Sequence, residues 1–150
     1  MDTVDNKVPR AAAWLGGLGA LPFIALAGSL PFLIGTPRNF VVHAMASYGA
    51  TILTFLGGIH WGLAMESARG RDNTGFGARL VGSIMPSLVG WTALLIPATI
   101  GLILLAAAIA AMLWVDLRAT RAGYVPRWYP KLRIPLSCVV IATLLFGAVA

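Results

Sequence analysis

The chain has 150 residues, of which 59% are hydrophobic and only 11% are charged. Soluble domains carry about 25% charged residues, so this composition excludes an ordinary soluble protein and indicates an integral membrane protein. The net charge of +6 does not indicate nucleic-acid binding, because the basic residues stand in short segments beside apolar stretches, where they act as topology signals. The single cysteine, Cys138, permits no internal disulfide.

Five apolar stretches follow a short polar tail over residues 1–13. We predict an all-α bundle of five transmembrane helices in one membrane domain, residues 14–150, with spans at residues 14–34, 40–65, 80–96, 99–115 and 134–150. Pro22 and Pro86 lie inside the first and third spans, and we expect helix kinks there. A cleaved signal peptide ending near Ala27 is the alternative for the first span, but the apolar stretch continues past that point.

The count of five spans, rather than four with one long helix over residues 80–115, rests on charge. Five spans place ten of the eleven Lys and Arg residues on one side and leave only Arg38 on the other. Four spans would divide the same residues five against six. The positive-inside rule therefore predicts that the N-terminus lies inside, in the cytoplasm or a mitochondrial matrix, and that the C-terminus lies outside.

The second span is predicted to be the central helix of the bundle, because its residues divide into three helical faces. A bulky face, suited to lipid, holds Tyr48, Ile52, Phe55, Ile59 and Leu63. Small residues on the other two faces allow close helix approach. The helix-packing positions predicted on these two faces are Gly49, Gly57, Gly58, Gly62 and Thr54.

Aromatic residues mark the predicted inner boundary of the membrane. We expect Trp14, Trp61, Trp114, Trp128 and Tyr129 to act as interface anchors. Basic and aromatic residues alternate over residues 118–133, which favours contact with anionic lipid headgroups at about 1 kcal/mol per basic residue. A solvated loop that only sets topology is the alternative interpretation.

His60 is the most informative polar residue, since it lies about 8 Å inside the inner end of its span at about 1.5 Å per residue. An ionisable group at that depth predicts either a functional site or a hydrogen bond that locks two helices together. Glu66, Asp116 and Arg133 fall near the same boundary and are candidates for an ion pair. We expect this pair to be structural rather than catalytic.

Several chemistries lack the residues that they need. His43 and His60 stand about 25 Å apart on one helix, which excludes a haem held by both in one chain. Two distant histidines and one cysteine are too few for a metal cluster, and no nucleophile motif or phosphate-binding loop is present. We therefore expect no metal, no cofactor and no catalytic residue, and predict that the protein is not an enzyme.

The chain resembles the transmembrane protein 69 family, also called domain of unknown function 3429. The resemblance covers about residues 15–146, and its most specific part is the string Gly57-Gly-Ile-His-Trp-Gly62, followed by Met85-Pro-Ser87 and Trp128-Tyr129. It implies a multi-pass protein of bacterial or mitochondrial inner membranes and brings no established activity. Because no mitochondrial presequence precedes the first span, we expect a bacterial inner membrane.

Two functions are compatible with these patterns. The first is a non-enzymatic accessory or assembly protein that binds other membrane proteins through its small-residue faces. The alternative is a small transporter or a lipid- or quinone-binding protein that uses His60 in an inner-side cavity.

Overall fold

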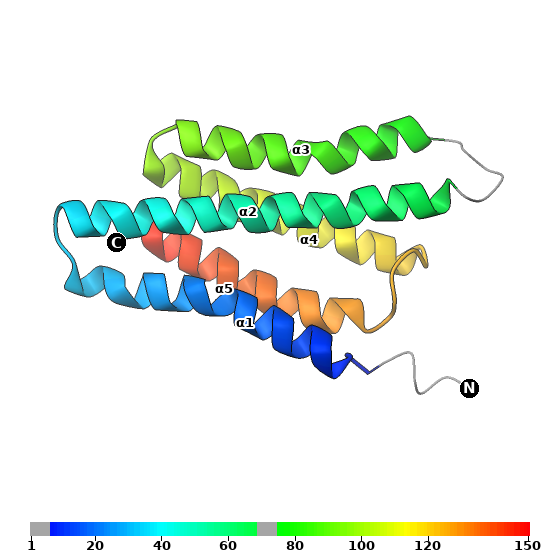
Figure 1. Ribbon diagram of the computed structural model, residues 1–150, viewed down its shortest axis with the longest axis horizontal. Coiled ribbons are helices and arrows are strands. Elements are labelled where there is room, and N and C mark those ends of the chain that lie inside the picture. Colours follow the sequence, from blue (N-terminus) through cyan, green and yellow to red (C-terminus); the bar gives the residue numbers. More distant parts are fainter. Residues whose placement is uncertain (1–6, 69–74) are drawn as a thin grey trace.

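The computed structural model describes residues 7–68 and 75–150. These residues form five long helices and one short 3-10 turn, which are α1 (Arg10–Ser29), η1 (Leu30–Phe32), α2 (Thr36–Ser67), α3 (Phe76–Leu95), α4 (Ala98–Arg121) and α5 (Tyr129–Val149) (Figure 1). All five helices are long and apolar enough to cross a membrane, as the sequence predicted. Part of the polar tail, residues 1–6, lies outside the described residues, as do Arg69 and Arg71 between the second and third spans.

Proline and glycine set the limits of the helices. Gly35 connects η1 to α2 with a φ of 67°, a left-handed conformation that favours glycine. Pro37 lies in the first turn of α2, where its missing N–H has no helical partner to lose. Pro97 separates α3 from α4 after an extended Ile96, so the apolar stretch over residues 80–115 is two helices and not one.

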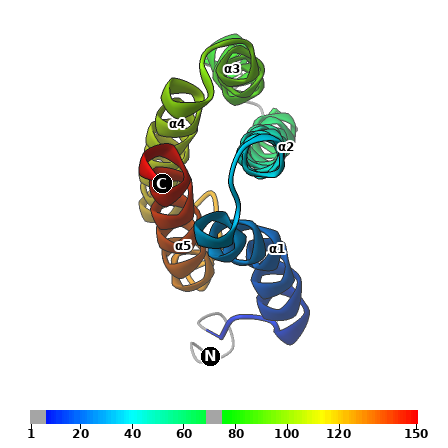
Figure 2. The same cartoon turned by 90° about the vertical axis from the view of Figure 1, so that its left-hand side faces the viewer.

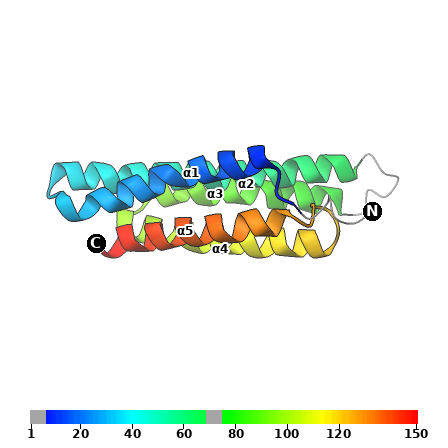
Figure 3. The ribbon, with the colours of Figure 1, turned by 90° about the horizontal axis from the view of Figure 1, so that it is seen from below.

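The helices pack in two layers, with α1, α2 and α3 in one and α4 and α5 in the other (Figure 3). Seen from the end, α3, α4, α5 and α1 form an arc, and α2 lies on its concave side (Figure 2). α2 contacts each of the other four helices, which agrees with its predicted central position. Its buried side chains Met45, Leu53 and Leu56 form part of the core together with Leu105 and Leu144.

One end of the bundle carries nearly all of the described basic residues. The first residues of α1, the end of α2 and the α4–α5 connection lie together at this end, and the C-terminus lies at the other (Figure 1). We call it the basic end. Its described Lys and Arg residues are Lys7, Arg10, Arg79, Arg118, Arg121, Arg127, Lys131 and Arg133, whereas Arg38 begins α2 at the opposite end.

The basic stretch between the fourth and fifth spans is mostly helical, which corrects the loop that the predicted spans left over residues 116–133. α4 continues to Arg121 and α5 begins at Tyr129, so only residues 122–128 connect them. The carbonyl groups at the end of α4 are favourably placed near Arg118 and Arg121, which explains why the helix continues beyond the apolar stretch. As a result, Asp116 and Arg133 both lie within helices that face each other.

The bulky face of α2 does not point away from the protein, which corrects another expectation. Ile52 and Ile59 pack against the core, and the Tyr48 hydroxyl donates a hydrogen bond of 3.0 Å to the carbonyl oxygen of Gly19. The Tyr48 ring also lies 4.9 Å from the ring of Phe23, centroid to centroid. A hydroxyl in an apolar medium requires a partner, and α1 supplies it, so this face turns towards α1. Phe55 alone on this face is largely exposed, at 64%.

Candidate functional site

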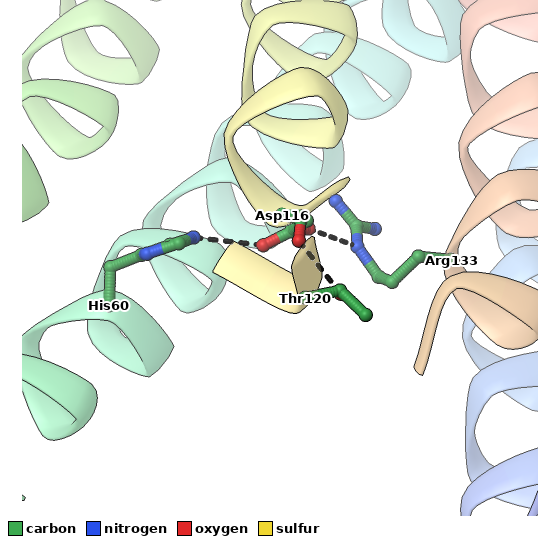
Figure 4. Close-up of polar contacts among 4 residues, drawn as sticks. All are labelled: His60, Asp116, Thr120 and Arg133. Carbon is green, nitrogen blue, oxygen red and sulfur yellow. Dashed lines mark hydrogen bonds and ion pairs between the residues drawn. The ribbon is translucent and has the colours of Figure 1, made fainter. Parts of the chain in front are cut away.

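A network of three side chains connects α2, α4 and α5 near the basic end (Figure 4). His60 Nε2 lies 2.8 Å from Asp116 Oδ1, and Arg133 Nε donates a hydrogen bond of 2.7 Å to Asp116 Oδ2. Thr120 donates to the backbone carbonyl of Asp116, one turn earlier on the same helix. Each carboxylate oxygen of Asp116 therefore has a partner on a different helix.

The network is buried from solvent, since Asp116 and Arg133 are exposed by only 2% and 7%. Removing an ion from water costs several kcal/mol, so such a residue requires close partners. Asp116 lies on the buried face of α4 with Ile109 and Met112, and this register directs its carboxylate between α2 and α5. Sequence analysis placed four polar candidates near one membrane boundary, namely His60, Glu66, Asp116 and Arg133. The structure brings His60, Asp116 and Arg133 into contact. Glu66 is exposed near the end of α2.

An apolar groove adjoins the Arg133 side of this network. It lies between α1, α2 and α5 and has a volume of about 340 Å³, within the range of small-molecule sites. We call it the Arg133 groove. Residues from one face of α1, from the bulky face of α2 and from one face of α5 line it, among them Leu15, Gly19, Phe23, Phe55, Ile59, Trp128, Leu132 and Val140.

Three polar atoms interrupt this apolar lining. Tyr129 Oη, Arg133 Nη2 and Ser137 Oγ belong to groove residues, are buried, and have no hydrogen-bond partner among the described residues. A buried polar group without a partner costs about 1–3 kcal/mol, and more when it is charged. Three such groups on residues that line one cavity indicate a place where a hydrogen-bond acceptor can bind.

A second, smaller pocket lies on the His60 side of the network. Its volume is about 280 Å³, and His60, Arg79, Ser83, Met112 and Tyr124 are among its lining residues. Arg79 donates a hydrogen bond of 2.9 Å to the Ser67 hydroxyl, and its guanidinium carbon lies 5.9 Å from the centre of the Tyr124 ring. His60 does not line the Arg133 groove, so the two cavities meet the network at opposite ends.

The predicted packing glycines of α2 fall into two groups. A Cβ added at Gly57 would lie 2.5 Å from the backbone oxygen of Ser83, and one added at Gly49 would lie 3.3 Å from Leu105, so both glycines permit close helix contact. Around Gly58 and Gly62, no described neighbour lies within 4 Å of an added Cβ, and Thr54 is exposed. This second group does not pack against another described helix of the chain.

The predicted interface anchors differ in their exposure. Trp14, Trp61 and Trp114 are exposed on helices near the basic end, whereas Trp128 and Tyr129 are half-buried and line the Arg133 groove. The guanidinium carbon of Arg118 lies 3.7 Å from the centre of the Trp114 ring.

The two predicted kink positions both lie inside helices, Pro22 in α1 and Pro86 in α3. Pro135 inside α5 is a further internal proline.

The sequence did not single out Ser137, and it placed Tyr129 only as an interface anchor. The signal that could have found them is their spacing, since Tyr129, Arg133 and Ser137 stand four residues apart and so share one face of a helix. Metal-binding residues do not gather in the same way: within residues 7–68 and 75–150, no three His, Cys, Asp or Glu side chains come together.

Comparison with known proteins gives two kinds of match. The family model described as "Protein of unknown function (DUF3429)" matches residues 8–149. A protein named "Transmembrane protein 69" from Xenopus tropicalis is 33% identical over 145 residues, which is 93% of this chain and 54% of that protein. One of the same name from Mus musculus is 26% identical over 135 residues, covering 87% of this chain and 52% of that protein. The chain thus spans about half the length of these curated relatives. No solved structure matches it.

Proposed function

The chain belongs to the transmembrane protein 69 family of proteins of unknown function (DUF3429), and we propose that it is a non-enzymatic membrane protein that holds an amphiphilic lipid in the Arg133 groove. The observation that carries this proposal is that three residues lining a mostly apolar cavity, Tyr129, Arg133 and Ser137, each have a buried polar atom without a hydrogen-bond partner among the described residues. An amphiphile supplies both an apolar body and a polar head, which are the two kinds of surface that the groove presents.

The dimensions and position of the groove support a lipid. Its lining runs from Ala12 to Phe23 along α1, which is about 16 Å at about 1.5 Å per residue. This is about half of the 30 Å hydrocarbon thickness of a bilayer, or roughly one leaflet. The groove begins at the basic end with Trp128 and continues inward to Val140, so a lipid in it would lie parallel to its neighbours in the same leaflet.

Access from the bilayer is available through the side of the bundle. Leu15 of α1 and Phe55 of α2 both line the groove, and they are exposed by 71% and 64%. Exposed apolar side chains at the rim of an apolar groove are compatible with lateral movement of a lipid tail between groove and bilayer. No passage through water is then required.

The experiment is a measurement of lipid that remains bound after purification. The full chain and the variant Gly19→Leu are purified in mild detergent, and bound molecules are counted by native mass spectrometry. Gly19 lines the groove, and an added Cβ there meets only the Tyr48 hydroxyl, at 4.0 Å, so we expect a leucine to occupy groove space without a backbone clash at its Cβ. Gly28→Leu on the same helix is the matched control, because an added Cβ there meets no described neighbour within 4 Å and Gly28 does not line the groove.

We expect about one retained amphiphile per chain for the original sequence and for Gly28→Leu, and a loss of most of it for Gly19→Leu. Equal retention by all three proteins would show that the lipids are held elsewhere on the surface, and the groove would lose its proposed role.

A second candidate function is the binding of another membrane protein on the outer face of α2. The observation that favours it is the open space around Gly58 and Gly62, a G-x-x-x-G spacing that allows close helix approach. Under this proposal, Gly58→Leu abolishes the co-purification of a partner from native membranes and leaves the stability of the chain unchanged. The absence of any stoichiometric partner from native membranes would contradict it.

The proposal also includes an orientation and a location. From the positive-inside rule we propose that the basic end lies in the cytoplasm and that the C-terminus lies outside. We also propose a bacterial inner membrane as the location, one of the two kinds of membrane that the family resemblance implies. Anionic lipid headgroups are the proposed partners of the residues 118–133, where Arg118, Arg121, Arg127 and Lys131 stand at the basic end.

A further inference from the structure

The geometry points to the chemical class of the amphiphile that the proposed groove function requires: its head is an acidic oxygen group, a carboxylate or a phosphate, and Arg133 binds it together with Ser137 and Tyr129. This inference rests on the proposed function, since it assigns the polar contacts of a molecule in the Arg133 groove. It also moves the head-binding role away from His60, which does not line that groove.

The three proposed head-binding residues lie in a row on one face of α5. Tyr129, Arg133 and Ser137 follow each other at intervals of four residues, which is a step of about 6 Å along the helix. Ser137 and Arg133 are exposed by only 1% and 7%, so water does not readily replace a missing partner. These three side chains are spaced inward along α5 from the basic end. A head group can therefore contact two neighbouring side chains while its tail continues along the groove.

Arg133 still has a donor for this head although it is already paired. Its Nε donates to Asp116, while its Nη2 has no partner among the described residues. A guanidinium presents several N–H groups in one plane and binds carboxylate and phosphate oxygens in particular. Arg133 can therefore bridge two acids, with Asp116 on one edge and the head group of the ligand on the other.

The donors and charges around the groove favour an acidic head over a neutral one. After pairing with Asp116, Arg133 keeps an N–H donor without a partner among the described residues. The other cations of the basic end add a favourable field for a negative charge. A neutral carbonyl would accept a weaker hydrogen bond from the guanidinium, because bonds between two charged groups are roughly twice as strong.

The test compares three single-chain probes that share one oleoyl tail. They are oleate, which carries a carboxylate; oleoyl lysophosphatidate, which carries a phosphate; and methyl oleate, which is neutral. Each is titrated against the full chain in detergent, and native mass spectrometry gives the bound fraction. We expect both acids, or one of them, to bind at least about tenfold more tightly than methyl oleate, as a charge-assisted hydrogen bond implies. The order of the two acids identifies the natural source, a free fatty acid or a phospholipid.

Two variants locate the head. Ser137→Ala removes a buried hydroxyl that has no hydrogen-bond partner among the described residues, so the ligand-free protein should fold at least as well as the original. We expect this variant to bind the acids about three- to tenfold more weakly and methyl oleate unchanged. Arg133→Lys keeps a charge but loses the planar fork, and we expect a loss of about ten- to a hundredfold for the acids. Ser87→Ala on α3, which is not a lining residue of the Arg133 groove, should change neither.

Two failures are distinguishable. If methyl oleate or a short-chain quinone binds as tightly as the acids, or if both variants leave the preference for acids unchanged, the acidic head is wrong while the groove remains a lipid site. If none of the probes binds and Gly19→Leu also retains as much lipid as the original chain, the groove function itself is wrong.

Discussion

The side chain of Asp116 connects three helices. Its carboxylate accepts from His60 of α2 and from Arg133 of α5, and it is 2% exposed. Breaking a buried ion pair by removing one partner costs about 3–5 kcal/mol, because the remaining charge stays buried and unpaired. We therefore expect Asp116→Leu and Arg133→Met each to lower the free energy of unfolding by about this amount.

The double variant Asp116→Leu/Arg133→Met provides the decisive comparison. With both charges removed, no unpaired ion remains, so the double variant should be more stable than either single one. Unfolding of the purified proteins in mixed detergent micelles, followed by circular dichroism, measures all three. Additive losses in the double variant would contradict the pairing and indicate that each residue acts alone.

His60 should contribute less than Asp116, because its side chain is 16% exposed and makes one polar contact among the described residues, to Asp116. We expect His60→Phe to lower the free energy of unfolding by about 1.5–2 kcal/mol, the lower part of the range for a hydrogen bond to a charged group. His43→Phe on the same helix is the control, since His43 is exposed at the opposite end. A loss as large for His43→Phe would mean that the His60 contact has no special value.

At the scale of whole helices, the packing of α2 against α3 depends on Gly57. An added Cβ there would meet the backbone oxygen of Ser83 at 2.5 Å, and a backbone atom cannot move aside as a flexible side chain can. We expect Gly57→Ala to separate the two helices and to lower the free energy of unfolding by about 1–3 kcal/mol. Gly58→Ala, one residue later in open space, should stay within about 0.5 kcal/mol of the original. The same micelle unfolding assay compares them, and equal effects would contradict the close contact.

This pair of glycines also shows what the sequence could and could not predict. The number of helices followed from hydropathy and charge, because span length and loop charge are local properties. The pattern could not distinguish Gly57 from Gly58, since both lie on faces made of small residues and only the position of α3 decides which one is buried. The hydroxyl of Thr51 donates to the carbonyl of Ser47 within its own helix, so this hydroxyl needs no partner on a neighbouring helix.

The candidate site was predictable to a similar extent. The common depth of His60, Asp116 and Arg133 at one membrane boundary was visible from span assignment alone, and that depth brought them together. The Arg133 groove was not visible, because a cavity arises from how α1, α2 and α5 fit against one another. Because α5 begins at Tyr129, where the predicted spans left a loop, Tyr129 shares a helical face with Arg133 and Ser137. The predicted span from residue 134 did not include Tyr129, so this shared face was not recognised from the sequence.

At the scale of the whole molecule, the charge distribution predicts which way the bundle crosses the membrane. The described Lys and Arg residues lie at one end except for Arg38, so that end should face the cytoplasm. The sequence contains one cysteine, Cys138, which makes a cysteine-free background simple to obtain with Cys138→Ser. Thr36→Cys and Ala122→Cys then place single thiols at exposed positions on opposite ends of the bundle.

In intact cells, we expect a membrane-impermeant maleimide to label Thr36→Cys and to leave Ala122→Cys unlabelled until the membrane is opened with detergent. The Cys138→Ser background is the control for labelling at other groups. Labelling of Ala122→Cys alone would reverse the orientation, and the Arg133 groove would then lie in the outer leaflet. Labelling of both positions in intact cells would contradict the five-span arrangement itself, because residues 36 and 122 are separated by three helices and must lie on opposite sides.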